Sequence, residues 1–302
     1  MCEKCQKRQK IVLLFSILIA FILLLAYFTA EKEPIAPAPQ ATVIVSTFPL
    51  YEAAREVAGD SLRIRCVVPL GSDSHLFSPN PTQVADISKA ALFIYNGGGF
   101  ETWVEPIKRT LPKTMSIMDM STQVALLQND PHYWLDINNM IKMTQALDAR
   151  FSKLLPAKAM MFHANAIAYS AKLETLKLHY TQGLAECKNR TLITNHDAFG
   201  YLAHANQLQN ISVIGLSSDE QPSSQTIAKI IDIVKEHHIK IIFFEELISD
   251  NVAQTIAKET GAKAQPLQPL ENISQDELKS HQTYLTIMED NLKKLREAME
   301  CR

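Results

Sequence analysis

Short apolar runs alternate with amphipathic stretches along most of the chain after residue 40. This alternation is typical of strands and helices that follow one another in parallel α/β sheets. The apolar runs predict four strands in each half of the chain, at 42–46, 62–68, 91–95 and 115–118, and then at 191–194, 211–214, 239–244 and 263–266. The stretches between them predict helices at 51–58, 82–89, 103–110, 199–205, 223–237 and 251–259.

The segment 157–186 lies between the two halves and contains no proline. Pro156 suits the first turn of a helix, and Gly183 suits its far end. At 1.5 Å per residue, such a helix would be about 40–45 Å long, which is more than an ordinary globular helix. We therefore predict two α/β lobes, 41–156 and 187–302, joined by one rigid backbone helix that allows only a small hinge motion.

The N-terminal segment 1–30 has the pattern of a targeting element. Four basic residues occur in the first ten positions, and an apolar run follows at 11–28. A run of about 18 residues can span a bilayer and is longer than the core of most cleaved signals. We expect residues 1–30 to remain as a membrane anchor with the body outside the cytoplasm, and a signal cleaved after Ala30 is the alternative. Residues 31–40, rich in Pro and Glu, predict an extended spacer.

The composition is that of a globular protein, with 47% hydrophobic residues, 21% charged residues and a formal net charge of −2. The near-neutral charge argues against nucleic acid as a partner, because binding to phosphates calls for a basic surface. The CxxC at Cys2 and Cys5 has no second pair, and Cys66 in an apolar run suits the core. Cys187 and Cys301 could form a disulfide if the fold brings their Cα atoms within about 7 Å.

Three of the nine histidines stand in contexts that could follow buried strands. They are His75 in GSDSHLFSPNP (71–81), His132 in DPHYWLD (130–136) and His196 in TNHDAFGYLA (194–203). A lone histidine is usually a surface or hydrogen-bonded core residue, but open α/β sheets bind their ligands at the carboxyl ends of strands. Three imidazoles that converge there would form a ligand set for a divalent metal, above all zinc.

Together with NGGGFETWVEP (96–106), SSDEQPSS (217–224) and IIFFEELIS (241–249), these motifs resemble the substrate-binding receptors of zinc and manganese ABC importers. Their order and spacing match over roughly residues 41–299. The resemblance implies two lobes around a metal cleft, with His75, His132 and His196 as ligands. It also implies an importer permease and its ATPase as partners. We expect an extracytoplasmic monomer that is a receptor rather than an enzyme.

The fourth ligand is left open by the sequence. These receptors commonly carry an Asp in a Leu-Asp-Pro-Leu pattern, and Gln268 stands at that place in Leu267-Gln268-Pro269-Leu270. Gln268, Glu101, Glu220 and water are all candidates. Asp197 adjoins His196 and is expected to orient it. Asp136 is expected either to orient an imidazole or to cap the next helix.

Zn²⁺ is the predicted cargo, because a site of three nitrogens suits zinc, whereas manganese prefers shells rich in oxygen. A receptor for Mn²⁺ or Fe²⁺ is the alternative. A zinc hydrolase would share the three-histidine shell, but it needs a general base and a substrate pocket, and the sequence has no HExxH motif. A surface adhesin is the third reading, and the composition gives no support for a host-protein surface.

Overall fold

The computed structural model describes residues 18–19, 21, 40–127, 130–216, 222–245 and 250–302. Its contacts divide the chain into two compact units, Met1–Gln40 and Ala41–Arg302. Most of the predicted anchor at 11–28 and all of the spacer except Gln40 lie outside the described residues. No helix within the described part of the chain has the length and apolar character needed to cross a membrane.

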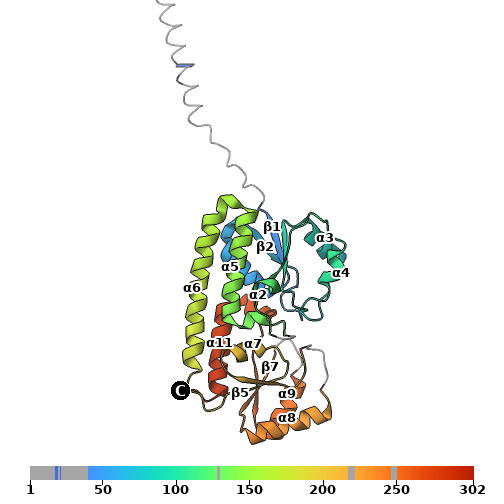
Figure 1. Ribbon diagram of the computed structural model, residues 1–302, viewed down its shortest axis with the longest axis vertical. Helices are drawn as coiled ribbons and strands as arrows, with labels where there is room; N and C mark the ends of the chain where they lie inside the picture. The colour runs from blue at the N-terminus through green and yellow to red at the C-terminus, as the bar shows by residue number, and fades with distance from the viewer. Residues whose placement is uncertain (1–17, 20, 22–39, 128–129, 217–221, 246–249) are drawn as a thin grey trace, which may run out of the picture. The chain divides into compact units, whose positions relative to one another are not determined.

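The first half of the body forms one four-stranded sheet (Figure 1). Its strands are β1 (Thr42–Val45), β2 (Arg63–Cys66), β3 (Leu92–Tyr95) and β4 (Ile117–Asp119). They run parallel in the order β2-β1-β3-β4. The helices that connect them are α2 (Phe48–Ala58), α3 (Pro81–Lys89) and α4 (Val104–Lys108). Each of these elements overlaps the one predicted from the apolar pattern.

The second half repeats this topology with the order β6-β5-β7-β8, again all parallel. Its strands are β5 (Thr191–Thr194), β6 (Gln209–Ser212), β7 (Ile241–Phe244) and β8 (Lys263–Pro266). The helices between them are α7 (Gly200–Ala205), α8 (Ser224–Glu236) and α9 (Asn251–Thr260). β6 begins two residues before its predicted start, because Gln209 already pairs with Thr191 at the sheet edge. Two parallel sheets flanked by helices are therefore confirmed.

The predicted backbone helix is present as α6 (Ala159–Gly183). It packs against a second long helix that was not predicted from the sequence. That partner is α5 (Ile137–Leu154), which is joined to α6 by the short turn η4 (Pro156–Lys158). The two helices lie side by side in Figure 1, and α11 (Tyr284–Ala298) packs near the far end of α6. One hydrophobic cluster runs through this helical layer, from Val43 in β1 to Met299 after α11. The two sheets therefore share a continuous core.

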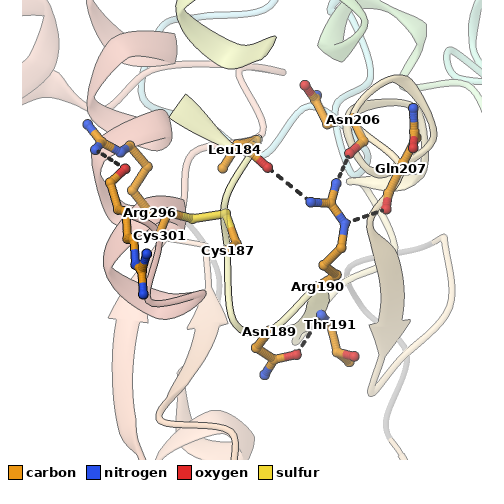
Figure 2. Close-up of a disulfide and its surroundings, with 10 residues drawn as sticks. Leu184, Cys187, Asn189, Arg190, Thr191, Asn206, Gln207, Arg296 and Cys301 are labelled. Atoms are coloured by element: carbon orange, nitrogen blue, oxygen red, sulfur yellow. Dashed lines mark hydrogen bonds between the residues drawn. A yellow bond between two sulfur atoms is a disulfide. The ribbon is translucent and has the colours of Figure 1, made fainter. Parts of the chain in front are cut away.

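A disulfide between Cys187 and Cys301 closes the C-terminal end of this layer (Figure 2). The two Cα atoms are 3.8 Å apart although the residues are separated by 114 positions. Beside the disulfide, the Arg190 guanidinium donates hydrogen bonds to the carbonyl oxygens of Leu184 at 3.0 Å, Asn206 at 2.6 Å and Gln207 at 3.1 Å. These bonds join the ends of α6 and α7 to the start of β5.

Candidate metal site

Four side chains from four separate loops meet at the carboxyl ends of the strands. His75 lies between β2 and α3, His132 directly precedes the 3₁₀ turn η3 (Tyr133–Leu135), His196 follows β5, and Glu271 follows β8. One nitrogen from each histidine and one oxygen from Glu271 lie within 4.8 Å of one another. The fold thus brings the three predicted histidines together and adds a carboxylate that the motifs did not identify.

Glu271 is the hub of this cluster. Its Oε1 lies 3.0 Å from Nε2 of His75 and 3.0 Å from Nε2 of His132. The contact with His75 is a hydrogen bond. Nε2 of His132 is fully buried and, among the described residues, has no partner with hydrogen-bond geometry. A buried ring nitrogen that faces a carboxylate without bonding to it requires an explanation, and a site for a cation between them provides one.

His132 is oriented by Asp130. Oδ1 of Asp130 accepts from the His132 backbone N–H at 2.9 Å and lies 2.8 Å from ring Nδ1. A proton held on Nδ1 by this contact leaves the lone pair of Nε2 directed into the cluster. Gly200, the first residue of α7, makes room for this arrangement, because a Cβ there would lie 2.4 Å from Oδ2 of Asp130.

His196 is buried, and both of its ring nitrogens face oxygen atoms. Nδ1 contacts the buried carboxylate of Glu245, and Nε2 lies 2.9 Å from the carbonyl oxygen of Leu216. Burial works against the charged ring, but the negative charge of Glu245 and its hydrogen bond outweigh burial and raise the pKa of His196 to about 10. A metal that binds His196 must therefore displace a proton or one of these partners.

The charges of Glu271 and His132 are set by the same balance between burial and neighbouring charges. Burial would raise the pKa of Glu271, but the positive charges of His75 and His132 and the hydrogen bond with His75 hold it well below its usual range. Burial would lower the pKa of His132, but the hydrogen bond to Asp130 and the negative charge of Glu271 raise it instead. The surroundings thus favour the ionised form of Glu271 and the protonated forms of His132 and His196.

Two other candidates for the fourth ligand, Gln268 and Glu101, make hydrogen bonds away from the cluster. The amide of Gln268 donates to the Glu277 carboxylate at 3.0 Å and 3.2 Å and accepts from Leu270 N–H at 3.3 Å. The carboxylate of Glu101 accepts from Ser46 and from the backbone N–H groups of Asn96 and Gly97, so it braces a loop. Glu220 lies outside the described residues.

The two acids expected to orient the ligands also act elsewhere. Asp136 accepts from Asn138 N–H at 2.9 Å and caps α5, which is the second of the two roles considered for it. Asp197 accepts from the Asn210 amide at 2.8 Å and makes no hydrogen bond to His196. Asp130 and Glu245 take the orienting role instead. Both could have been found from the sequence, because Asp130 lies two residues before His132 and Glu245 directly follows the buried strand β7.

Comparison with known proteins identifies the family of this chain. The sequence profile described as the periplasmic component A of the zinc-uptake complex matches residues 43–298. The zinc-binding lipoprotein AdcA of Streptococcus pneumoniae is 34% identical over 278 residues, which cover 85% of this chain and 56% of AdcA. The high-affinity zinc uptake system protein ZnuA of Bacillus subtilis is 30% identical over 277 residues, which cover 85% and 87% of the two chains.

A solved structure agrees with these sequence matches. The Zn(II)-bound ZnuA-like domain of S. pneumoniae AdcA superposes with a TM-score of 0.78 at 33% identity, covering 86% of this chain and 99% of that domain. The fold and site define a two-lobed α/β protein with four candidate metal ligands at the carboxyl ends of its strands. The chain belongs to the family of the periplasmic component A of zinc-uptake complexes. It spans a little over half the length of the AdcA protein that it matches.

Proposed function

We propose that this protein is an extracytoplasmic receptor that binds Zn²⁺ through His75, His132, His196 and Glu271 and delivers it to the permease of an ABC importer with its ATPase. The observation that carries the proposal is the meeting of these four side chains, from four loops, with their ligand atoms within 4.8 Å. Three imidazole nitrogens and one carboxylate oxygen are a set of four donors of the kind that binds zinc tetrahedrally.

The choice of zinc over manganese or iron rests on the donor atoms. Mn²⁺ favours oxygen-rich shells with more than four ligands, whereas Glu271 is the one carboxylate that the described residues bring to this cluster. The names of AdcA and ZnuA, which refer to zinc binding and zinc uptake, support the same choice. A manganese or iron receptor of the same importer class is the alternative.

Metal content and competition measurements test the proposal. The purified full-length chain is analysed for bound metals by mass spectrometry, and then titrated with Zn²⁺ and Mn²⁺ against a chelator of known affinity. We expect one zinc per chain and a clear preference for Zn²⁺. Preference for Mn²⁺ would favour the alternative receptor, and failure to bind either metal would reject the receptor assignment.

The membrane attachment remains a separate proposal. The apolar run at 11–28 supports an uncleaved anchor that holds the body on the outer side of the membrane. N-terminal sequencing of the protein from its own membrane tests this, since a mature chain that starts near Glu31 would show cleavage. The expected monomeric state is tested in the same preparation by light scattering.

A further inference from the structure

We propose that Asn272 is a positioning residue that latches the loop of His75 to the loop of Glu271, and that this latch controls the rate at which the metal leaves. The inference rests on the proposed function of the site. It assigns a role to a side chain that is not one of the four candidate ligands. The two loops belong to opposite halves of the chain: one lies between β2 and α3, and the other between β8 and α10 (Gln275–Lys279).

The amide of Asn272 is built into the junction of the two loops. Its Nδ2 donates to the carbonyl oxygen of Pro69 at 2.8 Å and to that of Ser72 at 2.7 Å. Its Oδ1 accepts from Ile273 N–H at 2.9 Å, which fixes the side chain to its own loop. Asn272 is only 3% exposed, so water does not replace these bonds. Both protons of one amide are therefore used to hold the opposite loop.

Two further bonds cross the same junction on either side of Asn272. Ser74 Oγ donates to the carbonyl oxygen of Glu271 at 3.3 Å, and the Gln275 amide donates to the carbonyl oxygen of Leu70 at 2.6 Å. Gly71 has a φ of 85° and lies so close to Gln275 that a Cβ would be 2.9 Å from its Nε2. The loop before His75 is thus shaped to fit the loop that follows β8.

This junction links the two candidate ligands that come from these loops. Ser74 directly precedes His75, and Glu271 directly precedes Asn272. The two ligand side chains meet at 3.0 Å between Nε2 of His75 and Oε1 of Glu271. When the latch is closed, both ligands are held around the same point, so a bound cation would have to break two contacts together. If the latch opens, His75 can move away and the cation loses one ligand at a time.

The chemistry of the amide gives a sharp test. Asn272→Asp keeps the size of the side chain but replaces two donated hydrogen bonds by a carboxylate that faces two carbonyl oxygens. Asn165→Asp is the matched control, because Asn165 also donates its amide to a carbonyl of another element, that of Val57 at 3.1 Å, away from the four ligands. Ser74→Ala removes a cross-loop bond with little change in volume, and it serves if Asn272→Asp does not fold.

The measurement is the rate of zinc release from the full-length protein, followed by stopped flow after mixing with excess chelator. We expect release to be at least about tenfold faster in Asn272→Asp, severalfold faster in Ser74→Ala and unchanged within twofold in Asn165→Asp. The visible spectrum of the Co²⁺-substituted variants should keep its band positions, because the ligands themselves are intact.

If Asn272→Asp and Ser74→Ala release zinc at the rate of the unmodified protein, the latch proposal is wrong. Equal acceleration in Asn165→Asp would also overturn it, since the effect would then be one of general stability. A wild-type protein that binds no zinc would instead reject the proposed function of the site, so the two failures can be told apart.

Discussion

Asp130 holds His132 at two points, with one carboxylate oxygen 2.9 Å from the backbone nitrogen and 2.8 Å from ring Nδ1. Asp130 does not belong to the cluster of candidate ligands, yet it sets the direction in which Nε2 of His132 points. Loss of such a partner typically costs about 10–100-fold in metal affinity. The structure therefore separates residues that would bind the cation from residues that aim them.

Asp130→Ala is expected to weaken zinc binding by about 10–100-fold, because His132 would lose its fixed orientation. Gly200→Ala should act in the same direction, since its new methyl group would displace the Asp130 carboxylate. Asp136→Ala is the control: it removes the cap of α5, so it should cost about 1 kcal/mol of stability and leave zinc affinity nearly unchanged. Competitive titration and thermal melting of the three variants distinguish these effects, and equal affinities for Asp130→Ala and Asp136→Ala would contradict the assignment.

Replacing a candidate ligand should lower zinc affinity more than replacing a residue that orients the ligand. His75→Ala, His132→Ala, His196→Ala and Glu271→Ala are each expected to lower zinc affinity by more than the about 10–100-fold expected for an outer partner. His163→Ala and His179→Ala serve as controls, because these histidines lie on α6 and pair with Asp148 and Glu289. Any of the four replacements that leaves the affinity unchanged removes that residue from the ligand set.

Gln268→Asp tests whether Glu271, rather than residue 268, is the fourth ligand. The Gln268 amide faces the Glu277 carboxylate at 3.0 Å, so an aspartate there would place two like charges together. We expect the variant to be less stable and to bind neither Zn²⁺ nor Mn²⁺ more tightly. Stronger manganese binding would show that position 268 faces the metal.

The central strands were predictable because a buried strand leaves an apolar run such as 241–244 in the sequence, whereas an edge strand such as β8 leaves a much weaker one. The histidines were predictable for a related reason, since polar residues after such runs collect at one edge of a parallel sheet. Glu271 was not, because the path of its loop depends on tertiary contacts. Leu270 adopts a left-handed φ of 63° directly before Glu271, and Asn272 bonds to a loop about 200 positions away.

Two missed features did leave a trace in the sequence. The buried positions of α5, at Ile137, Met140, Thr144, Leu147 and Phe151, repeat at helical spacing. Glu245 follows a strand end in the same way as the histidines do. The proline-free segment after Pro156 gives a stronger helix signal than α5 does. Asp197 adjoins His196 in the sequence, whereas Glu245 is 49 residues away and reaches it only through the fold.

Zinc affinity should fall as the pH falls, because the pKa values of His132 and His196 are raised and protons compete for the same nitrogens. With the pKa of His196 at about 10, this competition already operates at neutral pH. In the metal-free protein, the stabilisation from this raised pKa is full below the unfolded value of about 6.5 and is lost as the pH rises through the folded value.

Glu245→Gln provides the control for this pH dependence. The variant removes the negative charge that raises the pKa of His196, so the loss of zinc affinity should begin at a lower pH than in the unmodified protein. Zinc titrations between about pH 6 and pH 8 measure both curves, with a slope of about tenfold per pH unit for each proton released. Curves that coincide would show that Glu245 does not control the protonation of His196.

Loss of the disulfide should lower the stability of the fold and leave zinc affinity nearly unchanged. Cys187 and Cys301 close a loop across 114 positions, and the chain-entropy account gives about 5 kcal/mol for a loop of this size. A variant with Cys187→Ser and Cys301→Ser is therefore expected to melt at a clearly lower temperature, while its zinc affinity stays within about threefold because the four candidate ligands lie at the other ends of the strands.

Cys66 is the internal control for thiol chemistry: burial raises its pKa to about 12, so it should react slowly with thiol reagents in the folded protein. Thiol titration of the native, unreduced chain under denaturing conditions should then count Cys66 together with Cys2 and Cys5, with two further thiols only after reduction. Release of five thiols without a reductant would show that Cys187 and Cys301 are not joined.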